Sequence, residues 1–371
     1  MLMRATWERD DRRTLIAVML LTCAVRVPLL VAAPLWSNDA YRYVWDGNLA
    51  NHGVDPRSIA PNDGSLVERR NSPLWKHVDL RDIATVYPPV AIALFRLEAA
   101  IDPVGVRGAK IVALAGDALT IVVLLAALRR LRLPRGRIAV YALHPLVLVS
   151  FAQDAHIEAF AVAGTCTAIA APKCLRIAGF SLAILVKLYP LIFVPATFAR
   201  DRRSAALLAA VVLAAYAPAL TSGHALGSLH AYVVTQRFNE TLVYAFGAPT
   251  AGLILALGVV LAVGAVLRGV SLAPTLLFLA ALYLLTTPNA LPWYLTIVPA
   301  LSALIFRPFS SRWSSAVAGL VAWSFTVVLA YGAPWWVAGG SPGDLAVRAV
   351  EYAPVVVGAL LCFRRPFAPE A

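Results

Sequence analysis

The chain has 371 residues, of which 60% are hydrophobic and 14% are charged, and its mean hydropathy is +0.75. This composition excludes a pair of water-soluble domains and predicts an all-α polytopic membrane protein, which we take as one domain over residues 1–371. Of the 32 Lys/Arg, 19 lie in short clusters beside hydrophobic runs. Such clusters set membrane orientation, so the net charge of +12 leaves no basic patch for nucleic acid.

The first hydrophobic run, residues 14–35, follows a basic tail and is long enough to cross a bilayer, so we interpret it as a retained anchor. Basic clusters favour the cytoplasmic side. The tail is therefore predicted inside and residues 36–86 outside, with about twelve spans and both termini in the cytoplasm. The hydrophobic runs lie at 14–35, 87–102, 106–128, 138–152, 157–171, 175–198, 204–221, 247–267, 272–288, 290–306, 313–332 and 345–363.

Residues 36–86 form the largest polar stretch, directly after the first run. The stretch holds seven acidic and six basic residues among several tryptophans and tyrosines. A polar loop of this size at a membrane surface indicates a functional site. Three further polar segments are predicted on the same outer face, at 153–158, 222–247 and 333–344.

Two hydrophobic runs are predicted not to cross the membrane. The run 87–102 is short, begins Tyr-Pro-Pro and carries Arg96 and Glu98, which favours an interfacial or re-entrant helix. This places the basic cluster 129–137 inside. The run 175–198 has basic residues at both ends and Pro190 near its centre. Because proline removes a helical hydrogen bond, we interpret this run as two half-helices that meet at Lys187.

Asp39 begins a stretch in which Tyr41, Trp45 and Leu49 recur at four-residue spacing. That stripe predicts a helix lying on the membrane surface, with Arg42 and Asp46 turned away. Asp39 itself has two interpretations. In the first, Ser37, Asn38 or Asp39 caps this helix. In the second, Asp39 is a general base placed where a lipid-borne substrate meets an aqueous acceptor.

The outer turn 153–158 reads Gln-Asp-Ala-His-Ile-Glu. Asp154, His156 and Glu158 are residue types that bind several divalent ions. Three residues without a fourth ligand equally fit a helix cap with interfacial polar groups, and we predict no metal.

Three other residues also have alternative interpretations. An ammonium inside a membrane needs a cavity or a partner, so Lys187 either binds a phosphate or pairs with Asp117, for which Arg26 is the competing partner. Arg237, in the outer loop 222–247, either holds a phosphate or extends to the interface. Trp293 belongs either to a binding site or to an aromatic belt.

Five motifs follow one another along the chain: SNDAYRYVWDG, ATVYPPVAIALF, HPLVL with QDAHIEA, LVKLYPLIFVP and PNALPWYL. In this order they resemble integral-membrane glycosyltransferases of the GT-C fold. They are most similar to bacterial polyprenyl-phosphate-sugar enzymes, including mannosyltransferases of glycosyltransferase family 87. The resemblance covers roughly residues 35–305 and implies a GT-C-like bundle with a large first extracytoplasmic loop.

The resemblance also implies roles for particular residues. The catalytic acid of the family's first outer loop corresponds to Asp39, and the Tyr-Pro-Pro element closes that loop. Asn38 stands where many relatives have a second acid, and Arg57 stands where relatives often have Tyr. Lys-x-Tyr-Pro corresponds to the lipid-phosphate region, and the His-x-acid turn corresponds to the second outer segment. The predicted substrate-binding residues are Arg42, Tyr87, His156, Glu158, Lys187, Tyr189, Arg237 and Trp293, with no cofactor.

The function implied by the resemblance is transfer of a sugar, in this family mannose, from a polyprenyl-phosphate carrier to a glycan or glycolipid hydroxyl. The expected location is the periplasmic face of the cell inner membrane. No G-x-G-x-x-G or P-loop pattern for a nucleotide occurs. The alternatives are a transporter or flippase of a lipid-linked saccharide, and a polymerase or ligase that uses lipid diphosphates. Transporters often have broken helices in both halves, and one predicted break favours an enzyme.

Overall fold

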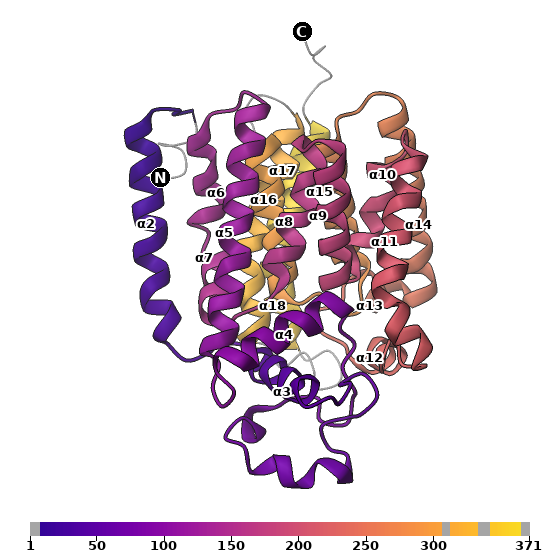
Figure 1. Cartoon of the computed structure of the whole chain (residues 1–371). Helices are drawn as coiled ribbons and strands as arrows, with labels where there is room; N and C mark the ends of the chain where they lie inside the picture. The colour runs from indigo at the N-terminus through magenta and orange to yellow at the C-terminus, as the bar shows by residue number, and fades with distance from the viewer. Residues whose placement is uncertain (1–7, 306–311, 333–341, 365–371) are drawn as a thin grey trace.

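The protein is a bundle of helices with a polar lobe at one end (Figure 1). The computed structural model describes residues 8–305, 312–332 and 342–364. Within these ranges, β-type pairing is limited to one bridge between Phe238 and Asn289. The prediction of an all-α membrane chain is confirmed. We call the end of the bundle that carries residues 36–86 the loop end, and the end that carries residues 8–13 the tail end.

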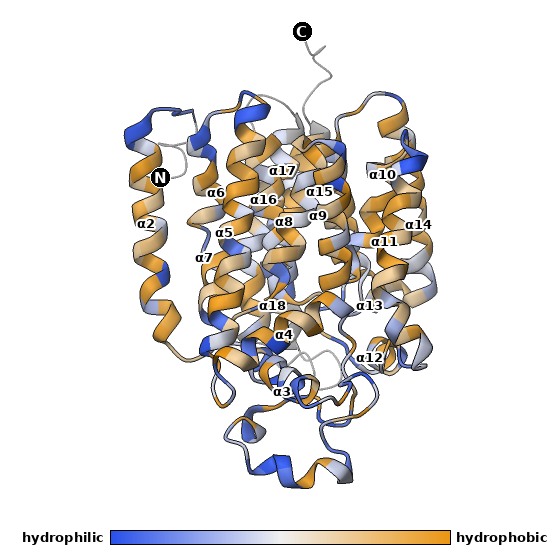
Figure 2. Cartoon of the chain, in the orientation of Figure 1, coloured by the Kyte–Doolittle hydropathy of each residue, from blue (hydrophilic) through white to orange (hydrophobic). Residues whose placement is uncertain are grey.

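Five segments of the described chain are long and apolar enough to cross a membrane by length and composition. In α14 and α11, side chains such as Leu253 (72% exposed) and Leu213 (62%) face outward, where lipid is a better solvent for them than water. Figure 2 shows the same pattern, with apolar residues along the bundle and polar ones at its ends and in the lobe. The five segments are α2 (Arg12–Val31), α5 (Arg107–Arg130), α11 (Arg202–Thr221), α14 (Ala248–Leu267) and Ser314–Tyr331, formed by α17 (Arg312–Thr326) and η7 (Val327–Gly332).

One predicted span, the run 138–152, is interrupted before a proline. The run 138–152 divides into α6 (Ala139–Ala142), α7 (Pro145–Val147) and the π-helix η4 (Leu148–Gln153). The run 290–306 is not interrupted, since η6 (Pro292–Thr296) passes directly into α16 (Ile297–Ile305). Pro145, at the start of α7, cannot donate the hydrogen bond that a continuous helix needs. The prediction of one broken segment is therefore wrong, and the contrast with transporters that rested on it does not hold.

The predicted break at Lys187 is confirmed. Helix α9 (Lys173–Val186) ends there, and η5 (Tyr189–Phe193) and α10 (Val194–Thr197) follow. Lys173 Nζ lies 2.8 Å from Asp201 Oδ2, so the segment enters and leaves at the same end of the bundle. At 1.5 Å per residue, α9 spans about 21 Å, which is shorter than the hydrocarbon core of about 30 Å. The segment is re-entrant, with its apex at Lys187.

Contacts at the tail end confirm that the run 87–102 does not cross. Arg135 Nε lies 2.7 Å from Asp10 Oδ1, and Gly136 N donates to Arg9 O at 3.0 Å, so the N-terminal tail and η3 (Arg135–Ile138) share one end. Between them, only α2 and α5 run the length of the bundle among the described residues. Helix α4 (Pro89–Ile101) has 13 residues and lies across the loop end beside α3 (Figure 1).

The polar lobe consists of α3 (Asp39–Asn51), η1 (Gly64–Asn71) and η2 (Trp75–His77). The predicted membrane-surface stripe is wrong, because Trp45 and Leu49 are 3% and 1% exposed and pack on the lobe and on α5. Arg42 and Asp46 are also buried, with Arg42 Nε 2.9 Å from Asp46 Oδ1. An apolar stripe predicts burial, and here protein rather than lipid covers it.

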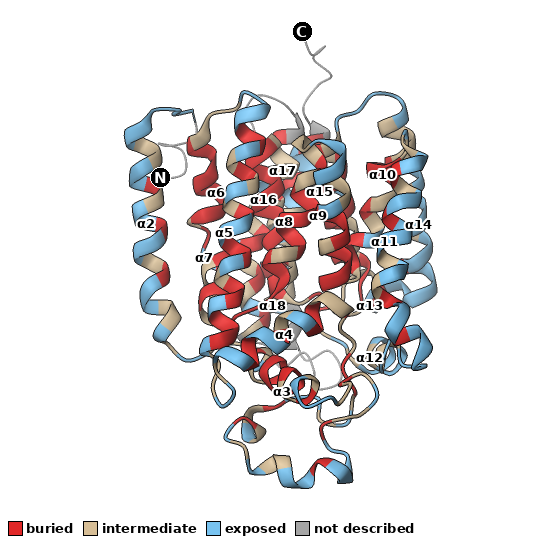
Figure 3. Ribbon diagram, in the orientation of Figure 1, coloured by how far each residue is buried: buried red, intermediate tan, exposed pale blue. Residues whose placement is uncertain are grey.

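The remaining helices complete the bundle: α8 (Glu158–Ala170), α12 (Leu229–Thr235), α13 (Leu242–Phe246), α15 (Leu272–Thr286) and α18 (Pro342–Arg364). One hydrophobic cluster, from Val18 to Val327, joins the two halves of the chain. Figure 3 shows this buried centre. The predicted outer segment 333–344 and the basic positions at 307–312 and 364–365 lie largely outside the described residues.

Candidate functional site

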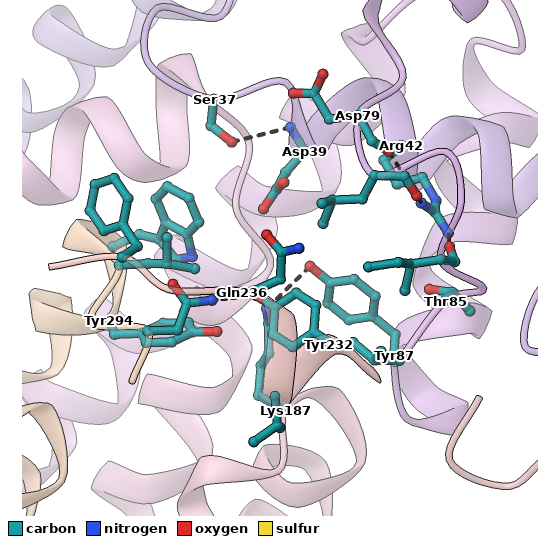
Figure 4. A pocket seen from close by; sticks show the side chains of 18 of the residues that line it. Ser37, Asp39, Arg42, Asp79, Thr85, Tyr87, Lys187, Tyr232, Gln236 and Tyr294 are labelled. Carbon is teal, nitrogen blue, oxygen red and sulfur yellow. Dashed lines mark hydrogen bonds between the residues drawn. The ribbon is translucent and has the colours of Figure 1, made fainter. Parts of the chain in front are cut away.

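A cavity of about 1010 Å³ opens at the loop end of the bundle. Four parts of the chain line it: the start of α3, the loop before α4, the break after α9, and the segments around α12 and η6. Figure 4 shows Asp39, Tyr87 and Lys187 facing this space together with Tyr232 and Gln236. The residues that the sequence placed in separate motifs therefore converge on one site.

Asp39 is the first residue of α3, but its side chain does not cap the helix. The Ser37 hydroxyl accepts a hydrogen bond from Asp39 N at 3.1 Å, and Asn38, at the cap position, makes no side-chain capping bond. The Asp39 carboxylate instead accepts from the Tyr43 hydroxyl, at 3.3 Å through Oδ2. Neither Asn38 nor Asp39 caps the helix through its side chain, and 31% of the Asp39 side chain stays accessible in the cavity wall.

The surroundings weaken Asp39 as an acid. Burial raises the pKa of its carboxyl group from 3.8 to about 6. The nearby Lys187 ammonium opposes this increase, and the negative charge of Glu158 adds to it. A carboxyl group with such a pKa is ionised at neutral pH and holds a captured proton more firmly than an exposed aspartate does.

A series of hydrogen bonds connects Asp39 with Lys187. Lys187 Nζ donates to Tyr87 Oη at 3.2 Å, Tyr87 Oη donates to Tyr43 Oη at 3.1 Å, and Tyr43 donates to Asp39. Lys187 Nζ also lies 2.6 Å from Glu158 Oε1, and Glu158 is fully buried. The predicted residues Asp39, Tyr87, Glu158 and Lys187 thus belong to one polar cluster.

The internal partner proposed for Lys187 is wrong. Asp117 pairs with Arg26, with 2.6 Å between Arg26 Nε and Asp117 Oδ2, and it also accepts from the Tyr141 hydroxyl at 2.9 Å. This second cluster fastens α2 to the bundle at the interruption between α6 and α7, where Arg26 also donates to Ala142 O at 2.8 Å. Lys187 pairs with Glu158 instead, and it lines the cavity.

His156 lies behind Asp39 in the turn before α8. Its Nδ1 is 3.6 Å from Asp39 Oδ2 and 3.9 Å from Glu158 Oε2, and its ring stacks on Trp293 with centroids 3.8 Å apart. Burial, aided by the Lys187 charge, lowers the pKa of His156 well below 6.5, so the ring is neutral. No group of three His, Cys, Asp or Glu in the described chain has an arrangement that would hold a metal ion.

The other predicted residues lie at the cavity in different ways. Tyr189 lines it and stacks on Tyr283, with ring centroids 5.7 Å apart. Arg237 lines it while paired with Glu240 at 2.8 Å. The Arg42 side chain borders the cavity, but each of its guanidinium nitrogens donates within the protein, to Asp46 and to the carbonyls of residues 79, 80 and 83. Its observed contacts hold the loop before α4 in place.

Sequence reasoning missed Tyr43, Tyr232 and Asn289. Tyr43 lies four residues after Asp39, so helical spacing already placed both on one face. Tyr232 and Asn289 come from distant segments and meet at 2.7 Å between Asn289 Nδ2 and the Tyr232 hydroxyl. The sequence gives no local signal for that contact.

The fold and the site together define a polytopic membrane protein with an acid and an ammonium facing one cavity at the end of its bundle. A family model described as alpha-(1->6)-mannopyranosyltransferase, N-terminal domain, matches residues 1–201. The chain therefore belongs to this family and is a mannosyltransferase that transfers mannose to a glycan acceptor, as the resemblance predicted. No curated protein matches the chain. The matched residues include Asp39, Tyr87, His156, Glu158 and Lys187.

Proposed function

We propose that this mannosyltransferase takes mannose from a polyprenyl-phosphate carrier and transfers it to a glycan or glycolipid hydroxyl on the extracytoplasmic face, forming an α(1→6) linkage. The observation that carries this proposal is the shared cavity of Asp39 and Lys187. A base and a cation within one space match the two charges that develop when an alcohol displaces a phosphate.

The proposed chemistry assigns each charge to a residue. The acceptor oxygen forms a bond to the anomeric carbon of mannose while its proton passes to the free oxygen of Asp39, since Oδ2 is held by Tyr43. The bond from the anomeric carbon to the phosphate oxygen breaks, and that oxygen keeps the electron pair. The Lys187 ammonium stabilises the departing phosphate. One base with in-line attack inverts the anomeric centre.

A lipid donor suits the walls of the cavity. Leu188, Leu229 and Val233 contribute apolar lining, and Val233 is 48% exposed at the loop end. A polyprenyl chain reaches such a site from the bilayer without leaving an apolar environment. Trp293, Tyr189 and Arg237 remain the proposed substrate contacts around the sugar and phosphate, and Arg42 is proposed to act through the loop that it holds.

The basic clusters at the tail end support the proposed extracytoplasmic placement of the cavity. The basic clusters at 129–137, 173–176 and 200–203 and Arg268 lie at the ends of helices away from the lobe, and such clusters remain in the cytoplasm. The cavity would then open on the outer, periplasmic side of the inner membrane. We also propose that residues 1–371 act as one domain, because residues beyond the matched region, such as Trp293 and Tyr331, line the same cavity.

The test offers purified protein three labelled mannose donors: mannosyl-phosphate polyprenol, a mannosyl diphosphate lipid and a mannose nucleotide. Consumption of the first alone supports the proposal. Consumption of the diphosphate lipid would instead support a polymerase or ligase, and consumption of the nucleotide would overturn the lipid donor.

The same assay tests the base. Asp39→Asn keeps the size of the side chain but removes the proton acceptor, so turnover should fall by about 100-fold or more while donor binding persists. Asp82→Asn is the matched control, because Asp82 is exposed and contacts Asn62 outside the cavity. Asp46 cannot serve as this control, because it is buried in the ion pair with Arg42. Near wild-type turnover in Asp39→Asn would remove Asp39 from the mechanism.

A further inference from the structure

The hydroxyl groups of Tyr43 and Tyr87 stand between the two charged residues of the site. Each hydroxyl donates toward Asp39 and accepts from the side of Lys187, so the bonds run in one direction over the whole series. Asp39 accepts through Oδ2 in this series, and its side chain lines the cavity.

Helix α4 holds both tyrosine rings in place. The Tyr43 ring stacks on Phe95 with centroids 4.4 Å apart, and the Tyr87 ring meets the edge of Phe95 at 4.9 Å. Tyr43 and Phe95 are fully buried. Gly47 permits this approach of α3 to α4, because a Cβ at this position would lie 1.9 Å from Phe95 O. The two hydroxyls are therefore set by packing rather than by contact with solvent.

We propose that Tyr43 is a positioning residue that orients the Asp39 carboxylate and, through Tyr87, joins the base and the phosphate-binding cation into one hydrogen-bonded unit. This inference rests on the proposed function, in which Asp39 takes the proton and Lys187 holds the phosphate. The structural consequence is that a change at Tyr43, which needs no contact with substrate, alters the base. Loss of either tyrosine hydroxyl interrupts the hydrogen bonds that connect Asp39 with Lys187.

The groups that face Asp39 determine in which direction its pKa moves when Tyr43 is changed. The Lys187 charge and the Tyr43 hydroxyl favour the ionised carboxylate, so they lower the pKa of Asp39, whereas Glu158 and Asp79 raise it. His156 is neutral at this site. Removing the Tyr43 hydroxyl should therefore raise the pKa of Asp39. The other titratable groups around it are the hydroxyls of Tyr87, Tyr232, Tyr294 and Tyr331.

The experiment compares Tyr43→Phe, Tyr87→Phe and the double variant in the full-length protein, with mannosyl-phosphate polyprenol as donor. Tyr43→Phe keeps the stack on Phe95 but should lower kcat about twofold at pH 7, because it leaves less of the Asp39 carboxylate ionised, with little change in the KM for donor. The acidic limb of the pH profile should move upward by about one pH unit. Tyr41→Phe is the control, since Tyr41 stacks on His77 in the lobe, at 4.4 Å, and does not line the cavity.

The double variant tests whether the two tyrosines act on Asp39 as one connected series or as two independent residues. Once Tyr43→Phe has cut the series beside Asp39, adding Tyr87→Phe should leave the acidic limb where the single variant put it. Additive shifts, or a wild-type limb and kcat in Tyr43→Phe, would overturn the proposal. If Tyr43→Phe does not fold, Tyr87→Phe alone carries the test, with a smaller upward shift expected and no shift refuting it. An inactive Asp39→Asn beside an unaltered Tyr43→Phe would refute this inference and leave the proposed function standing.

Discussion

The burial of Asp39 predicts how the activity of this mannosyltransferase depends on pH. The perturbation is acidification from pH 7 to pH 5. With a pKa of about 6, Asp39 is ionised to about 90% at pH 7 and to about 10% at pH 5. Since only the ionised carboxylate accepts a proton, kcat/KM should fall by nearly tenfold over this interval. An aspartate with the ordinary value of 3.8 would lose less than about 10% of its ionised form over the same range.

The assay is an initial-rate series between pH 4.5 and pH 8 in detergent or nanodiscs, paired with thermal unfolding at each pH. A carboxyl group with a raised pKa binds its proton more tightly in the folded than in the unfolded state. Its contribution to the free energy of unfolding is therefore larger below pH 6 and decreases as the pH rises through 6. Activity and this contribution to stability should change in opposite directions, which separates loss of the base from acid unfolding.

A second carboxyl group needs a control, because burial also raises the pKa of Asp154 to about 6. Asp154 accepts from Leu35 N at 2.6 Å and from Trp36 N at 3.3 Å, and so fastens the loop end of α2. Asp154→Asn keeps an acceptor oxygen but does not titrate. The acidic limb of the pH–rate profile of this variant should therefore remain near pH 6. A limb near pH 4 in the wild type, or one that disappears in Asp154→Asn, would refute the assignment to Asp39.

Two further predictions concern Lys187 and the topology. Lys187→Met leaves Glu158 buried without its partner at 2.6 Å, so it should lower the free energy of unfolding by about 3–5 kcal/mol. The Lys187→Met/Glu158→Gln variant should recover much of this loss. Equal melting temperatures in the wild type and the two variants would contradict the buried pair. Single cysteines placed in η1 and in η3 of a cysteine-free background should react with an impermeant maleimide from opposite sides of the membrane. Labelling of both from the same side would restore the run 87–102 as a true span.

The parts of the fold predicted from the sequence are those with a local physical cause. Lys187 beside Pro190 in an apolar run predicts a break, because neither a buried ammonium nor a proline fits a continuous lipid-facing helix. The same reasoning applied to Pro145, at the centre of the run 138–152, predicts the interruption between α6 and α7.

Other features depend on contacts that a single sequence does not encode locally. Asp117 had two possible cations, and the choice of Arg26 over Lys187 follows from packing between α2 and α5. The stripe of Trp45 and Leu49 predicted a buried face, but hydrophobic spacing does not distinguish lipid from a covering lobe. Tyr43 is different, since its spacing from Asp39 was visible and was not used.

The glycine of the WDG motif links the helical packing to the proposed chemistry. Gly47 lets α3 approach α4 so closely that Phe95 can support the rings of both Tyr43 and Tyr87. Those rings direct one hydroxyl to Asp39, in surroundings that raise the pKa of the carboxyl group toward the pH at which a base must both release and capture protons. A carboxylate in open water would be a weaker base, and one buried without these donors would remain protonated. The close contact between two helices therefore bears directly on the base strength of Asp39.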